Sequence, residues 1–258
     1  MRMAKGSIRR KIMLVIVSSV AAVTFLLAIF IYFAESAILT NILGKGRSHI
    51  AYTLNMYTVD ALNGKIEDAM SYTTRPLWKD VITETNSRYE GMDAESIRLK
   101  LLDMDKKWVA AKPGDPILKE YLENRVSMGM VDLLKARTKI SEIFITDKCG
   151  GLVAASGKTS DFYQADEEWW QKAYNGGKGS VYVSDIEFDE SSKNWVISLA
   201  VPIKDSKTGE VIGICKDRVG IEKLFGNLAS FKLGNTGHAI LIDNKGIVIF
   251  HHGISTMT

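Results

Sequence analysis

Three acidic residues stand directly before two adjacent tryptophans in Asp166-Glu-Glu-Trp-Trp170, in a chain that has only five tryptophans. Two of these carboxylates could act as an acid and a base. However, neighbours on a helix diverge by about 100° and cannot flank one scissile bond. Acids before an apolar segment are also typical of a helix start, where Asp166 can cap free N–H groups and Glu167 and Glu168 favour the positive end of the dipole. We therefore expect a short helix, closed by Gly176-Gly177, and no catalysis here.

The two tryptophans diverge for the same reason. One of them can enter a hydrophobic core while the other faces a cavity or solvent. The alternative is that both are ordinary core or surface aromatics, because pocket walls and cores are both rich in aromatic rings.

The remaining residue types predict neither a metal nor a cofactor. Cys149 and Cys215 are the only cysteines, and no Cys/His spacing typical of a zinc site occurs. His251 and His252 are adjacent in an expected strand and point to opposite faces. The sequence leaves open whether the two cysteines pair, and it predicts no catalytic residue in this chain.

The charge of the chain argues against a nucleic-acid partner. The formal net charge is +3, but the first eleven residues carry five basic residues and no acid. Removing them leaves 33 − 5 = 28 basic against 30 acidic residues, a balance of −2. The body of the protein is thus nearly neutral and has no basic stripe.

An uncharged segment of 23 residues, 12–34, predicts a membrane helix. At 1.5 Å per residue it spans roughly 35 Å, enough for a hydrocarbon core of about 30 Å. A cleaved signal peptide is the alternative, although its apolar part is usually shorter. The basic residues before the helix place residues 1–11 in the cytoplasm, so the chain beyond residue 34 is expected outside the cell or in the periplasm.

Helical periodicity continues beyond this segment. Apolar residues at helical intervals predict a long stalk helix from residue 35, with an end or kink at Arg75-Pro76. Asp93 opens a second helix that stops before Pro113. Leu118, Leu122, Val126 and Met130, at one-turn spacing, predict a third helix.

Beyond Thr138, β-branched runs separated by turn residues predict a five-stranded antiparallel sheet. The expected strands are 143–146, 152–155, 181–186, 195–203 and 211–215. The fold class is therefore α+β, with the helices first and the sheet after them.

A strand, an Asp-x-x-Gly turn and a returning strand occur twice. Asp147, Gly150 and Gly157 match Asp243, Gly246 and Gly253 at a constant offset of 96 positions. This repeat predicts that a second domain of the same type begins near Phe231. Because that copy stops at Thr258, we expect the sequence to be a piece of a longer chain.

Taken in order, these features resemble the double Cache family, the extracellular sensor modules of bacterial and archaeal receptors. The motifs that carry the resemblance are Ile145-Thr-Asp-Lys-Cys-Gly-Gly-Leu-Val-Ala-Ala-Ser156, Trp169-Trp170, Ser184-Asp-Ile-Glu-Phe-Asp189, Ile197-Ser-Leu-Ala-Val-Pro-Ile203, Val211-Ile-Gly-Ile-Cys215 and Gly237-His-Ala-Ile-Leu-Ile-Asp243. The resemblance implies a cytoplasmic N-terminus (1–11), a transmembrane helix (12–34), a stalk helix (35–90), a membrane-distal PAS-like Cache domain (91–230) and the start of a membrane-proximal one (231–258).

The resemblance also implies a small-molecule site in the distal domain. The implied ligand-binding residues are Tyr163, Glu167, Trp169, Trp170, Tyr182, Asp185, Asp189 and Arg218. Relatives that bind amino acids place an arginine where this chain has Glu167 and an aspartate where it has Arg218, so both charges are reversed. Arg218 is then a candidate to form a bidentate pair with a ligand carboxylate, and Glu167 or Asp189 is a candidate to bind a cationic group of the ligand. The alternative is that Arg218 and Glu167 pair with each other or face solvent.

The sequence thus predicts the extracytoplasmic sensor of a single-pass receptor in the inner membrane, without enzymatic activity of its own. Its ligand would be an organic acid, an amine or an amino-acid-like molecule, and the resemblance implies a homodimer through the stalk helices. A histidine kinase, a chemoreceptor (methyl-accepting chemotaxis protein) or a cyclase is the expected output module. The alternative is a membrane-tethered scaffold that holds no ligand and binds a partner protein. A pocket with converging polar groups around Trp169 would favour the sensor, and a pocket packed shut would favour the scaffold.

Overall fold

The computed structural model describes residues 8–136, 140–189, 194–243 and 245–251, except for the side chains of residues 9, 223, 227 and 229. The chain divides into two compact units, Met1–Tyr57 and Thr58–Thr258. The main sheet and the helices that cover it belong to the second unit.

Helix α1 (Ile8–Thr73) makes up the described part of the first unit and continues into the second. Within the described residues, it is the one helix long and apolar enough to cross a membrane, with a mean hydropathy of 2.8 in its most apolar part. The side chains of residues 12–34 are exposed almost throughout. The predicted break at Arg75-Pro76 is confirmed, because α1 ends at Thr73 and α2 (Pro76–Ser87) begins at the proline.

The second unit continues with three further helices before the sheet. Helix α3 (Ala94–Ala110) begins where predicted, with the Asp93 carboxylate accepting the Ser96 N–H at 2.8 Å. The predicted third helix is wrong in one respect, because it is two helices, α4 (Pro116–Leu122) and α5 (Arg125–Ala136). The side chain of Asn124 accounts for the break. Its Oδ1 accepts the N–H groups of Val126 and Ser127 at the start of α5, at 3.1 and 2.9 Å.

Replacing Asn124 with alanine is expected to lower the free energy of unfolding by about 1–2 kcal/mol, because it removes this cap and a bond from Asn124 Nδ2 to the Val153 carbonyl at 3.1 Å. Denaturant unfolding of the full chain measures the change. Asn124→Asp, which keeps the acceptor oxygen and loses the amide donor, should recover part of the loss. Equal stabilities of wild type and Asn124→Ala would contradict the capping role.

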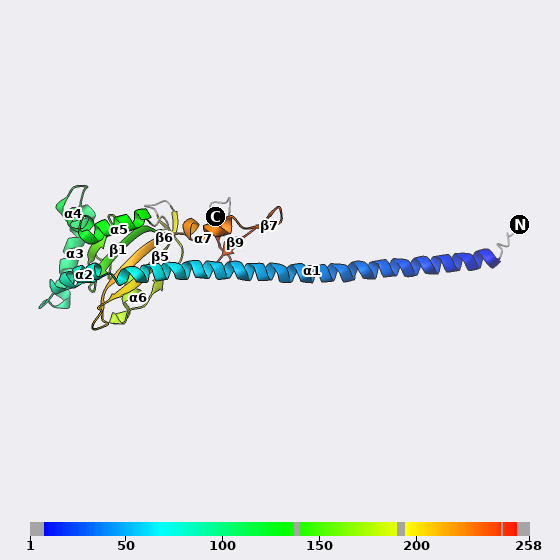
Figure 1. Ribbon diagram of the computed structural model, residues 1–258, viewed down its shortest axis with the longest axis horizontal. Helices are drawn as coiled ribbons and strands as arrows, with labels where there is room; N and C mark the ends of the chain where they lie inside the picture. Colours follow the sequence, from blue (N-terminus) through cyan, green and yellow to red (C-terminus); the bar gives the residue numbers. More distant parts are fainter. Residues whose placement is uncertain (1–7, 137–139, 190–193, 244, 252–258) are drawn as a thin grey trace. The chain divides into compact units, whose positions relative to one another are not determined.

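The α+β fold with an antiparallel sheet is confirmed. The main sheet has six strands, in the order β2-β1-β6-β5-β3 with β4 also pairing with β5. Strands β1, β6 and β5 are labelled in Figure 1. The strands are β1 (Ile140–Asp147), β2 (Leu152–Ala155), β3 (Tyr182–Val183), β4 (Glu187–Asp189), β5 (Asn194–Lys204) and β6 (Val211–Gly220). The strand predicted over 181–186 is therefore wrong in its extent, because the structure has the two short strands β3 and β4 in its place.

Helices cover both faces of this sheet. On one face, α2, α5 and the end of α1 pack through Trp78, Met130 and Tyr72 against alternate residues of the central strands, such as Ile143 and Cys215. On the other face, α3, α4 and α6 (Glu168–Tyr174) form a second core, which contains Leu101, Trp108, Leu118, Trp169, Trp170, Phe144 and Ile214. Figure 1 shows α5 and α6 on opposite sides of the strands. The period of two along each strand separates these two cores.

The two Asp-x-x-Gly turns have the same hydrogen bonds, as the repeat predicts. The Asp147 carboxylate accepts the N–H groups of Cys149 and Gly151 at 2.7 and 3.0 Å. The Asp243 carboxylate accepts those of Lys245 and Ile247, both at 2.8 Å. The third pair of the repeat cannot be compared, because Gly253 lies outside the described residues.

After the sheet, the chain forms α7 (Ile221–Ala229) and the short strands β7 (Lys232–Leu233), β8 (Gly237–His238), β9 (Ile240–Ile242) and β10 (Val248–His251). Strand β9 pairs with β10, and β7 pairs with β8. The second Asp-x-x-Gly turn connects β9 with β10.

The helix expected at the tryptophan pair is confirmed, but its ends differ from the prediction. Helix α6 begins one residue later than an Asp166 cap would require, because its N-cap is Glu167, which makes no side-chain cap bond. Its C-cap is Asn175 in the left-handed conformation, with φ 50°, and a 3₁₀ turn, η1 (Asn175–Gly177), follows. Asparagine tolerates this conformation and ends the helix before the two glycines are reached.

Candidate functional site

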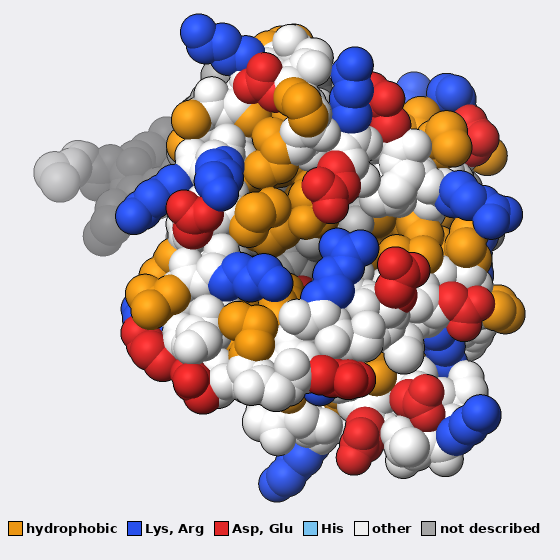
Figure 2. All heavy atoms as spheres, turned by 90° about the vertical axis from the view of Figure 1, so that its left-hand side faces the viewer, with side chains coloured by type: hydrophobic (Ala, Val, Ile, Leu, Met, Phe, Trp, Pro, Cys, Tyr) orange, Lys and Arg blue, Asp and Glu red, His pale blue; other side chains and the backbone are white. Residues whose placement is uncertain are grey.

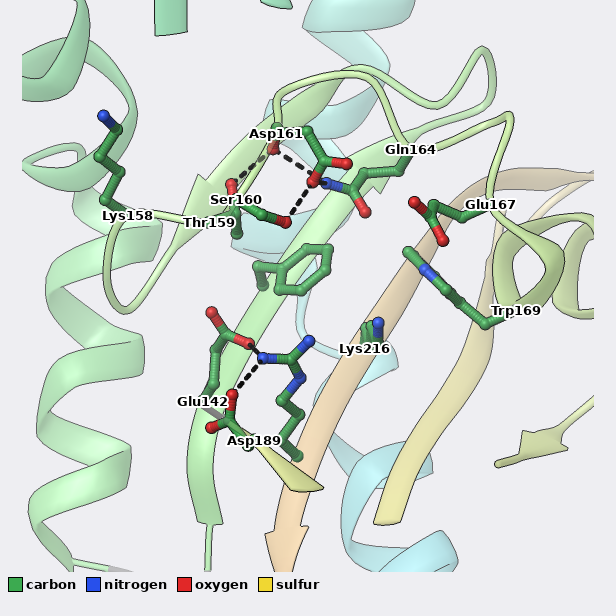
Figure 3. A pocket seen from close by; sticks show the side chains of 12 residues that line it. Glu142, Lys158, Thr159, Ser160, Asp161, Gln164, Glu167, Trp169, Asp189 and Lys216 are labelled. Atoms are coloured by element: carbon green, nitrogen blue, oxygen red, sulfur yellow. Dashed lines mark hydrogen bonds and ion pairs between the residues drawn. The ribbon is translucent and has the colours of Figure 1, made fainter. Parts of the chain in front are cut away.

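A cavity of about 530 Å³ lies on the α6 face of the sheet. Its wall combines strands β1, β4 and β6, the segment before α6, and the first turn of that helix (Figure 3). The lining residues are Glu142, Phe144, Lys158, Thr159, Ser160, Asp161, Gln164, Glu167, Trp169, Asp189, Lys216 and Arg218. The volume lies within the usual range for small-molecule sites of about 300–1,000 Å³.

The sheet register brings four of these residues together. In the antiparallel pairing of β1 with β6, Glu142 lies opposite Arg218 and Phe144 lies opposite Lys216. Because residues two apart on a strand share a face, all four side chains lie on the α6 side of the sheet.

Arg218 is held by two carboxylates. Its Nη1 lies 3.3 Å from Glu142 Oε2 and 3.2 Å from Asp189 Oδ1, as the dashed lines in Figure 3 show. The side chain of Asp189 is only 9% exposed. Burial raises the pKa of Glu142, while the nearby Arg218 opposes that rise. The alternative in which Arg218 pairs with Glu167 is therefore wrong. The guanidinium that was expected to form a bidentate pair with a ligand carboxylate already contacts two carboxylates of the protein.

Lys216 is a cation at the centre of the cavity that the sequence did not single out. Its side chain is buried, with 6% of the residue exposed. The ammonium lies 4.3 Å from the ring centroid of Trp169 and 5.8 Å from that of Phe144. Among the described residues, no ion pair or hydrogen bond is formed by this ammonium. Burial, with a further contribution from Arg218, lowers the pKa of Lys216 to about 8.

The two tryptophans lie in different environments, although the resemblance implied that both bind the ligand. Trp170 packs into the core, where its Nε1 donates to Thr146 Oγ1 at 2.9 Å and its ring stacks on Tyr174. Trp169 lines the cavity, edge-to-face with Phe144 at a centroid distance of 5.8 Å. Trp169 Nε1 is buried and has no hydrogen-bond partner in the described part of the chain.

At the upper edge of the cavity in Figure 3 lie Asp161 and Glu167. The Asp161 carboxylate accepts from Gln164 Nε2 and from Ser160 Oγ, both at 2.7 Å. The Glu167 side chain is largely exposed. The part of it that is buried raises the pKa of its carboxyl group, and the charge of Asp161 raises it further. Besides Lys216 and Arg218, the lining contains one more basic residue, Lys158. Its ammonium donates to the Val109 and Ala111 carbonyls at 3.2 and 2.9 Å.

Half of the site residues that the sequence indicated line this cavity. Glu167, Trp169, Asp189 and Arg218 do so. The other four lie elsewhere: Tyr163, Trp170 and Tyr182 pack in or against the apolar core, and Asp185 is exposed. The period of two along a strand could have indicated Lys216, since it is two residues from Arg218 and therefore on the same face of β6.

A second, smaller cavity of about 240 Å³ lies between α2, α3, α4 and β2, with Tyr89, Leu101, Met104 and Tyr121 among its lining. Figure 2 shows the end of the domain where α2, α3 and α4 lie, with hydrophobic side chains gathered in a hollow between charged ones. Tyr89 donates to the buried Asp147 carboxylate at 2.7 Å.

The two cysteines are free. Cys215 is buried in the core under α2 and α5, whereas Cys149 packs against the core on the other face of the sheet. No group of three His, Cys, Asp or Glu side chains in the described residues is arranged to hold a metal ion.

Comparison with solved structures gives distant likenesses. The ligand-binding domain of the Pseudomonas aeruginosa PAO1 amino-acid chemoreceptor PctC, in complex with GABA, is 15% identical (TM-score 0.38; 61% of this chain and 66% of that one). That of the Campylobacter jejuni chemoreceptor Tlp3, in complex with L-valine, is 14% identical (TM-score 0.39; 75% and 73%). The ligand-binding domain of the Pseudomonas fluorescens chemoreceptor CtaA, in complex with L-serine, is 14% identical (TM-score 0.35; 67% and 73%).

None of the curated proteins matches the sequence. The model of the Cache domain family in its double form matches residues 52–257, which is most of the chain and contains every residue that lines the cavity. The chain therefore belongs to the double Cache family of sensor domains.

Proposed function

We propose that this chain is the extracytoplasmic, small-molecule-sensing region of a transmembrane signal-transduction receptor. The observation that carries the proposal is the cavity, which is open and in which Lys216, Trp169 Nε1 and the Arg218 cluster converge. This arrangement favours a sensor over a scaffold whose pocket is packed shut.

The fold offers a route from the cavity to the stalk. Strand β6 presents Lys216 to the cavity, and it presents Cys215 on the opposite face to the core that contains Tyr72 near the end of α1. A ligand that favours one packing of β6 would thereby bias the last turns of α1. A coupling of about 1–3 kcal/mol is enough to shift an output equilibrium.

The remaining parts of the proposal concern topology and assembly. Residues 12–34 anchor the chain in the inner membrane with residues 1–11 in the cytoplasm, and residues 91–230 and 231–258 belong to a distal and a proximal Cache domain. Two chains pair through parallel stalk helices, and the receptor's output module is a kinase, a chemoreceptor or a cyclase. Cysteines placed singly along residues 38–70 should form intermolecular disulfides with a helical period, and their failure to do so would contradict the dimer.

A thermal-shift screen of the full chain in lipid nanodiscs tests ligand binding. The panel consists of amino acids, organic acids, amines and purines. A ligand present at a hundred times its dissociation constant should stabilise the protein by about 2.7 kcal/mol. Asp189→Ala should reduce the shift, whereas Asp185→Ala, an exposed aspartate outside the cavity, should leave it unchanged. A folded chain that responds to no member of the panel would favour the scaffold.

A further inference from the structure

Among the described residues, the groups around the cavity that lack a hydrogen-bond partner are all donors. In the described part of the chain, two side-chain atoms of the lining are buried without a partner, Trp169 Nε1 and Arg218 Nε. The Lys216 ammonium is a third donor that faces the cavity without an acidic partner among the described residues. Buried donors that the protein leaves unpaired are complementary to a ligand that brings acceptor oxygens.

Lys216 is the most costly of these groups to bury. An ammonium loses most of its hydration on burial, and a nearby carboxylate normally compensates for that loss. Here the compensation within the described residues comes from the face of the Trp169 ring, 4.3 Å away, which replaces only part of it. The acids whose charge acts most on Lys216 are Glu187 and Glu142, and neither forms an ion pair with it among the described residues. Glu142 is engaged by Arg218, and Glu187 accepts from Ser198 Oγ at 2.9 Å. An anion bound beside Lys216 would supply the missing charge.

We propose that Lys216 is the anion anchor of this cavity and that the ligand is a monocarboxylate, whose oxygens accept hydrogen bonds from Lys216 Nζ and Trp169 Nε1. This inference rests on the proposed function, because it specifies the ligand of the same cavity. It replaces the sequence-based expectation that Arg218 holds the carboxylate, and it assigns Arg218 to an ion-pair cluster of the wall.

The charges of the wall limit the ligand to one carboxylate. The lining carries four acids and three bases, which leaves a formal balance of 3 − 4 = −1. Asp161 and Glu167 stand at the edge of the cavity opposite the Arg218 cluster (Figure 3), where a second negative charge on the ligand would meet them. A dicarboxylate is therefore disfavoured relative to a monocarboxylate of the same length.

Binding should also depend on pH in a defined direction. Burial lowers the pKa of Lys216 to about 8, and a bound anion would raise it, so binding takes up a proton above that pH. Affinity should be nearly constant between about pH 6 and pH 8, where the ligand carboxylate is ionised, and fall by up to about tenfold per pH unit above about pH 8. The charged and titratable groups that face Lys216 are Glu142 on β1, Asp161 and Glu167 before α6, Glu187 and Asp189 on β4, and Arg218 on β6.

The test uses the full chain in nanodiscs with straight-chain monocarboxylates from acetate to hexanoate, their amides, and the dicarboxylates of equal length. Calorimetry and thermal shift give affinities for wild type, Lys216→Met and Lys158→Met. Lys158 is the matched control, because it lines the same cavity but its ammonium is held by backbone carbonyls. We expect Lys216→Met to weaken binding at least about 30-fold and Lys158→Met to change it less than about twofold.

The outcomes distinguish failure of the Lys216 anchor from failure of the proposed sensor function. Lys216→Met should fold at least as stably as wild type, since it removes a buried charge, and Lys216→Gln serves the same test if it does not. Unchanged affinity of a carboxylate for Lys216→Met overturns the anchor. If an amine, an amide or a purine binds wild type and no monocarboxylate does, the anchor is overturned and the sensor function stands. If no compound binds, both fail.

Discussion

Replacing Asp147 with alanine is expected to lower the free energy of unfolding by about 3–5 kcal/mol. The carboxylate is fully buried, and it accepts the N–H groups of Cys149 and Gly151 and the hydroxyl of Tyr89. Its removal leaves three donors unpaired, and two of them, the Gly151 N–H and the Tyr89 hydroxyl, are buried, at about 1–3 kcal/mol each before relaxation. Burial raises the pKa of Asp147, and these hydrogen bonds oppose the rise.

The repeated turn provides the control for this variant. Asp243 accepts two backbone N–H groups in the same pattern but is partly exposed, so water can replace its oxygens in Asp243→Ala. That variant should lose about 1 kcal/mol or less. Denaturant unfolding of the full chain in nanodiscs compares the two. Similar losses would show that the turn geometry alone, and not the buried contact with Tyr89, determines the contribution of Asp147.

The order of helices and strands could be predicted because it depends on local patterns. Asp93 and Pro113 bracket α3, and β-branched apolar runs mark β1, β5 and β6. The split of the third predicted strand could not be predicted, because it depends on a partner strand. Val183 pairs with Leu199 and Glu187 pairs with Val196, so the stretch between β3 and β4 contains one extra residue.

The same reasoning explains which part of the site was predictable. Trp169 and Arg218 were indicated because a family resemblance assigns roles to single positions of the sequence. The partner of Arg218 was not, since Glu142 lies on β1, which is brought beside β6 only by the strand order of the folded sheet. Once Arg218 was expected to bind the ligand, a second cation was not sought, although the period of two along β6 places Lys216 on the same face as Arg218. Among the described residues that line the cavity, Lys216 is the base that forms no ion pair or hydrogen bond, and its ammonium contacts the Trp169 ring instead.

A second large effect is expected from Asp217, on the face of β6 opposite Lys216. Only 2% of the residue is exposed, and burial raises the pKa of its carboxyl from 3.8 to about 7, against the weaker influences of the Cys215 thiol and Lys65. Between these two values the folded chain holds a proton that the unfolded chain has released. The free energy of unfolding should therefore decrease as the pH rises from about 4 to about 7, by about 3–4 kcal/mol from this group.

Asp217→Asn should abolish this part of the pH dependence, because the amide resembles the protonated carboxyl. Its stability should equal that of wild type near pH 4 and exceed it by a few kcal/mol at pH 8. Asp205→Asn is a control in which the pH dependence of stability has the opposite sign. Backbone N–H groups of Thr208 and Lys207 lower the pKa of the exposed Asp205, so its carboxylate stabilises the fold when it is ionised. Parallel pH profiles of wild type and Asp217→Asn would refute the assignment. Because Asp217 adjoins Lys216 in the chain and lies on the face of β6 that packs towards Tyr72, its ionisation would loosen the same contact that ligand binding is proposed to adjust.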